Sequence, residues 1–159
     1  MSQTTLESPQ DLLRLQLRTA LTMEDDSLAA LKELAAAAKS AEVKKLFRHH
    51  QDETKEQIQN LHRVFTILEI PESTAPSPST KGISKQAQSL IAKSAPSLRD
   101  QVTLSAALGN EHYEISAYQG LIIAVGGVDA EASRLLQDNL DQETHTSEEL
   151  LTRLKEMSS

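Results

Sequence analysis

The stretch P-E-S-T-A-P-S-P-S-T-K-G at residues 71–82 decides how the helices of this chain can be connected. Pro, Ser, Thr and Gly dominate the stretch, and these residue types favour turns and loops. We therefore expect an exposed linker here. Residues 83–94 then show apolar side chains at helical spacing, which predicts a short crossing helix. Residues 71–96 thus form one long connection in the middle of the chain.

Two long amphipathic helices are predicted on each side of this connection. Each combines apolar residues at helical spacing with start or stop signals. Capping patterns mark the helix starts at Ser8-Pro9-Gln10-Asp11, Ser40, Ser97-Leu98-Arg99-Asp100 and Asp129. The predicted helices span about 9–39, 41–70, 97–125 and 129–157.

The lengths of the connections predict the topology. Only a few residues join the two helices of each pair, so each pair should form an antiparallel hairpin. The middle connection at 71–96 is long enough to cross the whole bundle. We therefore expect an all-α, ferritin-like four-helix bundle whose long crossover carries a short extra helix, as a single domain over residues 1–159. The alternative is a simple up-down bundle with a floppy insertion.

The composition excludes several classes of protein. Aromatic residues make up only 3% and Trp is absent, which favours helix over sheet. A net charge of −7 argues against a nucleic-acid partner, which needs a clustered basic surface. The absence of Cys excludes disulfides, thiolate metal sites and a Cys nucleophile. With no signal-peptide pattern and no long apolar stretch, we expect a cytoplasmic protein without a membrane partner.

Each predicted long helix aims at least one carboxylate inward, on the same face as its apolar residues. These residues are Glu24, Glu53, Glu111 and Glu143, and counting from the tight turns puts them within about one helical turn of a common level. Four unpaired buried carboxylates would each cost several kcal/mol, and no Lys or Arg lies near the centre of these faces. Two divalent cations would offset the charge, as in bundle sites for iron or manganese. The sequence thus predicts a dinuclear metal site.

Two more residues are candidate ligands at this site, although the histidine pattern is unusual. His50 shares the inward face of its helix with Glu53, and Glu114 lies close to the direction of Glu111. The usual Glu-x-x-His pairs of such sites are missing: His50 precedes Glu53, and Thr146 follows Glu143 by three residues. The other histidines are expected to point sideways or outward: His49, His62, His112 and His145.

Four stretches resemble the YciE/YciF-type ferritin-like family of bacterial, rubrerythrin-like stress proteins. They are L-R-T-A-L-T-M-E (17–24), H-Q-D-E-T (50–54), E-H-Y-E-I-S-A-Y (111–118) and the region around Glu143. The resemblance implies a ferritin-like bundle that forms homodimers. It also implies a dinuclear site at Glu24, His50, Glu53, Glu111, Glu114 and Glu143. The chain departs from the family at Ser147, where an acid is common, and at Leu21 and Thr22.

These features predict a protein that uses two iron or manganese ions to act on peroxide or dioxygen in stress defence. Manganese would suit a catalase-like oxidoreductase, whereas iron would suit a peroxidase- or ferroxidase-like one. Two alternatives stay open. One is an iron-binding protein, and the other is a non-catalytic helical stress or scaffold protein with a structural or vestigial metal site.

Overall fold

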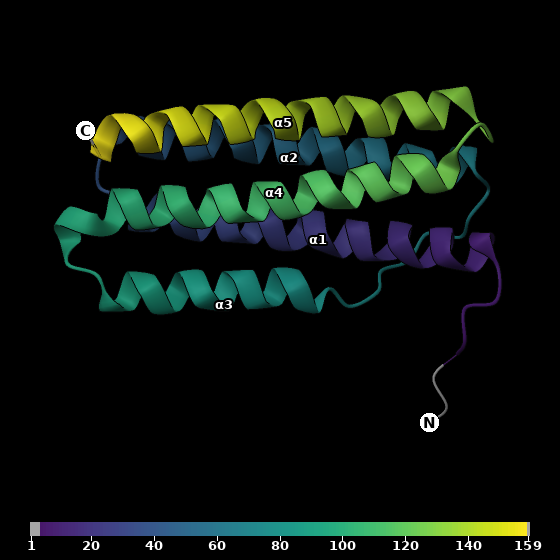
Figure 1. Cartoon of the computed structure of the whole chain (residues 1–159), viewed down its shortest axis with the longest axis horizontal. Helices are drawn as coiled ribbons and strands as arrows, with labels where there is room; N and C mark the ends of the chain where they lie inside the picture. Colours follow the sequence, from purple (N-terminus) through teal and green to yellow (C-terminus); the bar gives the residue numbers. More distant parts are fainter. Residues whose placement is uncertain (1–3, 159) are drawn as a thin grey trace.

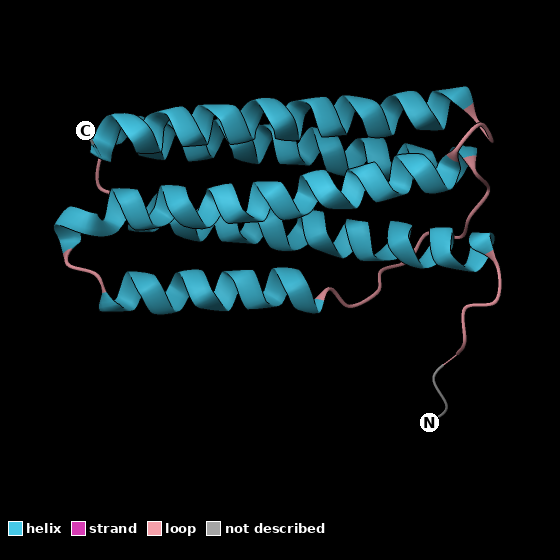
Figure 2. Ribbon diagram, in the orientation of Figure 1, coloured by secondary structure: helices cyan, strands magenta, loops and turns pink. Residues whose placement is uncertain are grey.

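The structure is a computed structural model that describes residues 4–158, in which every regular element is a helix (Figures 1 and 2). The all-α class expected from the sequence is therefore confirmed. The elements are α1 (Pro9–Ala37), α2 (Ala41–Ile67), α3 (Pro78–Lys93), the short 3₁₀ turn η1 (Pro96–Leu98), α4 (Arg99–Val125) and α5 (Ala130–Ser158).

Three of the four long helices begin at the caps that the sequence predicts. The Ser8 side chain accepts a hydrogen bond from the Asp11 backbone, and the Asp11 side chain closes a capping box. Ser40 caps α2 through the backbone of Val43. Asp129 caps α5 by accepting from the Ala132 backbone at 2.9 Å. Each cap satisfies backbone donors that a helix start leaves free.

The predicted capping box at residues 97–100 is wrong. Leu98 occupies the N-cap position of α4 and makes no side-chain cap. The Asp100 carboxylate instead accepts hydrogen bonds from the backbone of Lys39 at 2.6 Å and of Ser40 at 3.1 Å. Asp100 thus ties the start of α4 to the turn between α1 and α2.

The long helices form two hairpins packed side by side (Figure 1). α1 pairs with α2 and α4 with α5, while α1 also contacts α4 and α2 contacts α5. The segment between α2 and α4 returns along the bundle, and its helix α3 packs against α1 and α4. The observed topology is the predicted bundle with a long crossover.

The crossover is more ordered than the exposed linker expected at residues 71–82. Ala75 and Ser77 are buried, and the Ala75 backbone donates to the carbonyl of Arg18 at 3.2 Å. α3 begins at Pro78, ahead of the predicted start at 83, because Pro fits the first turn of a helix. The Thr80 hydroxyl donates to Asp26 on α1 at 2.8 Å, which fixes this start against the bundle.

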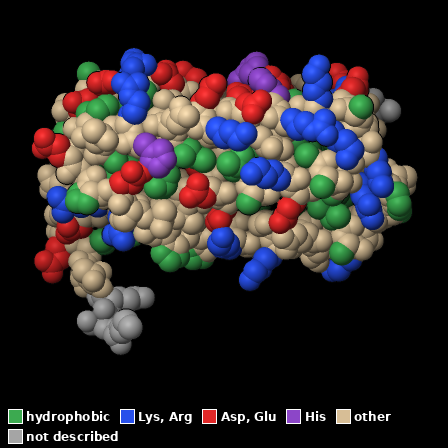
Figure 3. Space-filling model, turned by 180° about the vertical axis from the view of Figure 1, so that it is seen from behind, with side chains coloured by type: hydrophobic (Ala, Val, Ile, Leu, Met, Phe, Trp, Pro, Cys, Tyr) green, Lys and Arg blue, Asp and Glu red, His purple; other side chains and the backbone are tan. Residues whose placement is uncertain are grey.

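Charged groups of both signs are interspersed over the face of the bundle seen in Figure 3. None of the described helices combines the length and the apolar composition needed to cross a membrane.

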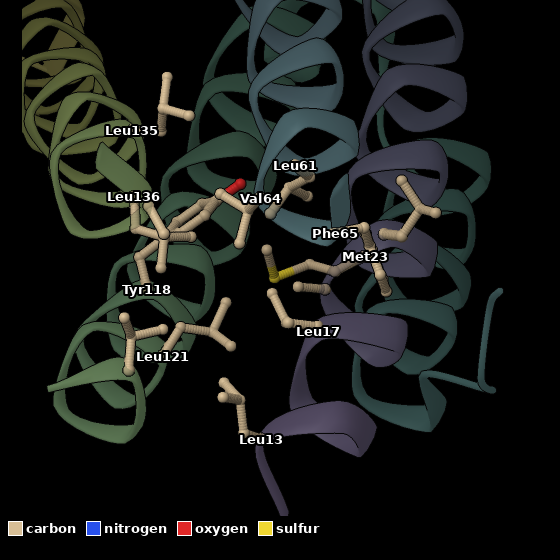
Figure 4. Packing of buried hydrophobic residues seen from close by; sticks show 14 residues of the cluster. Leu13, Leu17, Met23, Leu61, Val64, Phe65, Tyr118, Leu121, Leu135 and Leu136 are labelled. Atoms are coloured by element: carbon tan, nitrogen blue, oxygen red, sulfur yellow. The ribbon is translucent and has the colours of Figure 1, made fainter. Parts of the chain in front are cut away.

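The core consists of two apolar clusters with a polar band between them. One cluster packs Leu17, Leu61 and Tyr118 with residues of all four long helices (Figure 4). The other lies toward the opposite end of the bundle and contains Phe47 and Leu150. Between them the buried residues are polar: Glu24, Ser27, His50, Thr54, Gln57, Glu111, Glu114, Asn139, Glu143, Thr146 and Ser147. This band is where the sequence places its inward carboxylates.

Candidate metal centre

Three carboxylates from three helices meet in the polar band. Glu24 of α1, Glu114 of α4 and Glu143 of α5 each place an oxygen within 4.8 Å of the other two. All three side chains are buried, as is Glu111 one turn before Glu114. Glu24, Glu111, Glu114 and Glu143 are called the carboxylate cluster below.

The protein leaves much of this cluster without partners. Oε2 of Glu24, Oε2 of Glu111 and Oε1 of Glu114 are buried and make no hydrogen bond. No Lys or Arg side chain is buried anywhere in residues 4–158 to offset the charge. A buried carboxylate oxygen without a partner is costly, so the cluster has the properties of a cation site.

The electrostatics of the cluster follow from burial and from mutual repulsion. Burial raises the pKa of Glu24, Glu111 and Glu114 well above the ordinary carboxyl value, and the charge of Glu143 adds to the effect. Without a cation, the cluster therefore keeps its protons to a higher pH than ordinary carboxyls do. A bound cation would replace them and lower these pKa values.

A hydrogen-bonded network supports Glu24 from the side of the first apolar cluster. The Tyr118 hydroxyl donates to Oε1 of Glu24, and burial raises the pKa of Tyr118 well above its usual value. Asn139 donates to the Tyr118 oxygen at 3.1 Å and to the Gln57 carbonyl at 3.2 Å. No local sequence pattern indicates that Tyr118 and Asn139 are partners, because the two are on different helices.

Glu53 and His50 of α2 lie beside the carboxylate cluster rather than in it. Glu53 is partly exposed, and its carboxylate faces His49 at 3.2 Å, one helical turn away. His50 is buried and its Nε2 lies 3.6 Å from Glu149 of α5. Burial lowers the pKa of His50 to about 4, so its imidazole is neutral at pH 7. The predicted ligand set is therefore brought together only in part, through its α1, α4 and α5 members.

Glu149 is a residue of this region that the sequence reasoning missed. It follows His145 by four residues, the spacing that places two side chains on one helix face, and the two are 2.6 Å apart. This spacing of four residues is the sequence signal that could have indicated the contact between His145 and Glu149. Its contact with His50 crosses between helices, so no local pattern indicates it.

A small cavity lies next to Glu111, between α1, α3 and α4. Its volume is about 30 Å³, and its polar lining includes Ser27 and Asn110, which are joined by a 3.1 Å hydrogen bond. A space of this size holds about one water molecule. The crossover helix thus covers the cluster on this side.

Comparison with known proteins places the chain in a family. The model of DUF892, described as a domain of unknown function, matches residues 8–158. This chain belongs to the DUF892 family. Among curated proteins, no sequence matches the chain.

Solved structures show the same fold over nearly the whole DUF892 chain. YcfI of Rhodopseudomonas palustris, described as a candidate structural protein, is 27% identical with a TM-score of 0.90, over 96% of this chain and 98% of its own. The E. coli stress protein YciF is 24% identical with a TM-score of 0.84, and the match covers 96% of this chain and 98% of YciF. These findings confirm the YciE/YciF-type resemblance.

A third solved structure contains a domain that is described as ferritin-like. It is a two-domain protein of Anabaena variabilis with DJ-1/ThiJ/PfpI-like and ferritin-like domains. Its identity to this chain is 20% and the TM-score 0.68, over 96% of this chain and 38% of that one. The ferritin-like bundle predicted from connection lengths is therefore confirmed.

Two more buried polar residues of this DUF892 chain follow Glu143 on α5, and its four other histidines lie as the sequence predicts. Thr146 and Ser147 are buried on the inward face of α5, and the Ser147 hydroxyl donates to the Thr144 carbonyl at 2.7 Å. The side chains of His49, His62, His112 and His145 are exposed.

Proposed function

We propose that this protein binds two iron or manganese ions at the carboxylate cluster and acts on peroxide or dioxygen in stress defence. One observation carries the proposal. Glu24, Glu111 and Glu114 each keep a buried oxygen without a partner, and Glu143 is buried beside them. No Lys or Arg is buried in the described residues to neutralise these carboxylates. Ferritin-like bundles use such inward carboxylates to hold iron or manganese.

The donor set fits hard cations. It consists of carboxylate oxygens from α1, α4 and α5, and such ligands suit iron and manganese better than copper or zinc. Glu24, Glu111, Glu114 and Glu143 would hold the ions, with Glu53 close by on α2. The ions would supply one-electron redox chemistry, which no side chain of this cluster can supply alone.

The protein's own residues orient and shield this site. The Tyr118 hydroxyl fixes Oε1 of Glu24, which leaves Oε2 directed to a cation. Apolar clusters on both sides keep bulk water away and strengthen each charge interaction inside. Glu53 is 15% exposed and contacts His49, so it is the most exposed of the predicted ligands.

Metal content tests the binding half of the proposal. We expect natively purified protein, reconstituted with iron or manganese, to hold about two ions per chain by elemental analysis. Glu24→Gln and Glu143→Gln should lose the metal, because each removes a charged ligand. Glu148→Gln is the matched control, since Glu148 is an exposed acid on the same helix as Glu143. Fewer than about 0.2 ions per chain in the unaltered protein would contradict the proposal.

Peroxide consumption tests the catalytic half. The reconstituted protein should consume hydrogen peroxide, and Glu143→Gln should abolish the activity while Glu148→Gln keeps it. A structural role is the second candidate, favoured by the similarity to YcfI, which is described as a candidate structural protein. Two bound ions without peroxide or dioxygen turnover would support that second candidate.

A further inference from the structure

A groove runs between α2 and α5 on the side of the bundle opposite the crossover helix. Its volume is about 590 Å³, and His49 and Glu149 are among the residues that line it. The groove is open to solvent, whereas the carboxylate cluster is buried. The two helices that form it carry the remaining candidate ligands, Glu53 and His50.

Two imidazoles from two helices face the Glu149 carboxylate. Nε2 of His145 lies 2.6 Å from Oε1 of Glu149, and Nε2 of His50 lies 3.6 Å from Oε2. The His49 ring is next to that of His50, with centroids 5.9 Å apart. Imidazole nitrogen and carboxylate oxygen together form a common ligand set for divalent transition metals.

The His50 side chain supplies a second observation that points to a ligand. It is only 2% exposed, yet neither Nδ1 nor Nε2 makes a hydrogen bond. A buried imidazole normally fixes its tautomer through such a bond. The Glu149 carboxylate faces Nε2 of His50 at 3.6 Å, a distance too long for a hydrogen bond.

We propose that His50, His145 and Glu149 bind a divalent transition-metal cation beside this groove, which Glu149 lines, and separate from the carboxylate cluster. The imidazoles face different oxygens of Glu149, so a shared cation requires His145 to swing toward His50. The His145 side chain is 69% exposed, so solvent borders most of it and leaves room for this movement. The two imidazoles favour Fe²⁺, Co²⁺ or Zn²⁺ over the harder Mn²⁺.

The proposed site at His50, His145 and Glu149 is called the outer site below, and the position of Glu53 indicates its role. Glu53 contacts His49, a residue that lines the groove, at 3.2 Å. Burial raises the pKa of Glu53, and the charges of Glu149 beside the groove and of Glu143 in the cluster raise it further, so Glu53 is close to both groups of ligands. The outer site is placed to receive a cation and pass it through Glu53 to the buried carboxylates. The outer site stands by itself, whereas this delivery role rests on the proposed function.

Cobalt binding tests the outer site. The unaltered full chain should bind Co²⁺ with visible absorption bands of an imidazole-bound ion, measured by titration. Glu149→Gln combined with His145→Ala should weaken this binding by at least about tenfold, while Asp141→Asn combined with His112→Ala should not, because neither Asp141 nor His112 lines the groove. Both pairs alter exposed or half-exposed side chains, and circular dichroism checks that the helices remain.

The double variant Glu24→Gln, Glu143→Gln separates the outer site from the carboxylate cluster. It should keep the imidazole-type Co²⁺ bands, because it changes only the buried cluster. Loss of those bands in this variant, or unchanged bands in the Glu149 and His145 variant, would overturn the outer site. Bands that persist in a protein whose buried cluster binds no iron or manganese would support the outer site and contradict the proposed function alone.

Loading kinetics test the delivery role. Stopped-flow mixing with Fe²⁺ should show that Glu149→Gln slows filling of the carboxylate cluster by at least about tenfold, with the same final metal content. An unchanged loading rate would overturn delivery through this site. A lower final content with an unchanged rate would also overturn it, because Glu149 would then be a ligand of the buried centre itself.

Discussion

Glu24 receives one hydrogen bond from the protein, at Oε1, while Oε2 has no partner. We expect Tyr118→Phe to lower the free energy of unfolding of the metal-free protein by about 1–3 kcal/mol, because both Glu24 oxygens are then unpaired. Asn139 keeps its bond to the Gln57 carbonyl, so it adds little to the loss. Urea denaturation measures the change.

Tyr113→Phe is the matched control for this prediction. Tyr113 is a half-buried tyrosine on the same helix, with no hydrogen bond to the carboxylate cluster in the described residues. Equal stability changes in the Tyr118 and Tyr113 variants would show that the loss comes from the hydroxyl group in general, and not from the contact with Glu24.

The buried carboxyls predict how the stability of the metal-free protein depends on pH. In the folded state the raised pKa values keep Glu24, Glu111 and Glu114 protonated, while unfolded carboxyls ionise near 4.5. The folded state thus binds more protons, and stability falls as pH rises. The slope is up to about 1.4 kcal/mol per pH unit for each protonated carboxyl. Urea denaturation between about pH 6.5 and 8.5 measures it, and His50 opposes the slope only at the lower end of this range, where the unfolded imidazole is still partly protonated.

Glu114→Gln should make this pH slope shallower, because the amide removes one of the titrating groups and keeps nearly the same shape. Glu148→Gln, at an exposed position, should leave the slope as it is. A stability that stays constant or rises between about pH 6.5 and 8.5 would contradict protonation of the cluster.

At the scale of residues, helical periodicity predicts direction well and partners poorly. It places Glu24, Glu111, Glu114 and Glu143 inward because each lies at or near the centre of an apolar stripe. The same reasoning points Glu53 inward, yet Glu53 lies against His49 on its own helix. Which of two neighbouring groups a carboxylate contacts depends on distances between helices, and the sequence does not contain them.

At the scale of elements, Asp100 joins two hairpins that are far apart in the sequence. We expect Asp100→Ala to lower the free energy of unfolding by about 1–2 kcal/mol, since the Lys39 and Ser40 backbone donors lose their acceptor. Thermal or urea denaturation tests this. Asp138→Ala is the control, because its exposed pair with Arg134 contributes only about 0.3–0.5 kcal/mol. Similar losses of stability in the Asp100 and Asp138 variants would contradict this link between the two hairpins.

The helix starts show where element-level prediction works. Ser8, Ser40 and Asp129 bond to backbone groups three residues ahead, so a local pattern contains the whole interaction. Asp100 has the same local pattern but bonds to a turn about 60 residues earlier. A capping pattern therefore predicts that an acid will bind helix-end donors, and tertiary contacts decide which ones.

At the scale of the whole molecule, the bundle places a band of buried polar residues between two apolar clusters. The apolar clusters at both ends supply the burial that stabilises the fold, and the band between them has unpartnered oxygens. Connection lengths were sufficient to predict this topology, because only a long crossover can return α4 to the end where α2 began. The covering of Glu111 by α3 could not be predicted, since Ala75 and Ser77 are in a stretch whose composition favours a loop.

The docking of α3 is testable at one position. Ala87 is buried in the second apolar cluster and lines the cavity next to Glu111. We expect Ala87→Asp to release α3 from the bundle, because a carboxylate buried there would be unpaired. Limited proteolysis should then cleave residues 71–98 at least about tenfold faster, since cleavage follows the population of the opened form. Gln86→Asp places the same charge on the exposed neighbour and should leave cleavage unchanged. Equal cleavage of both variants would mean that α3 is already released in the unaltered protein, and that Glu111 is shielded by α1 and α4 alone.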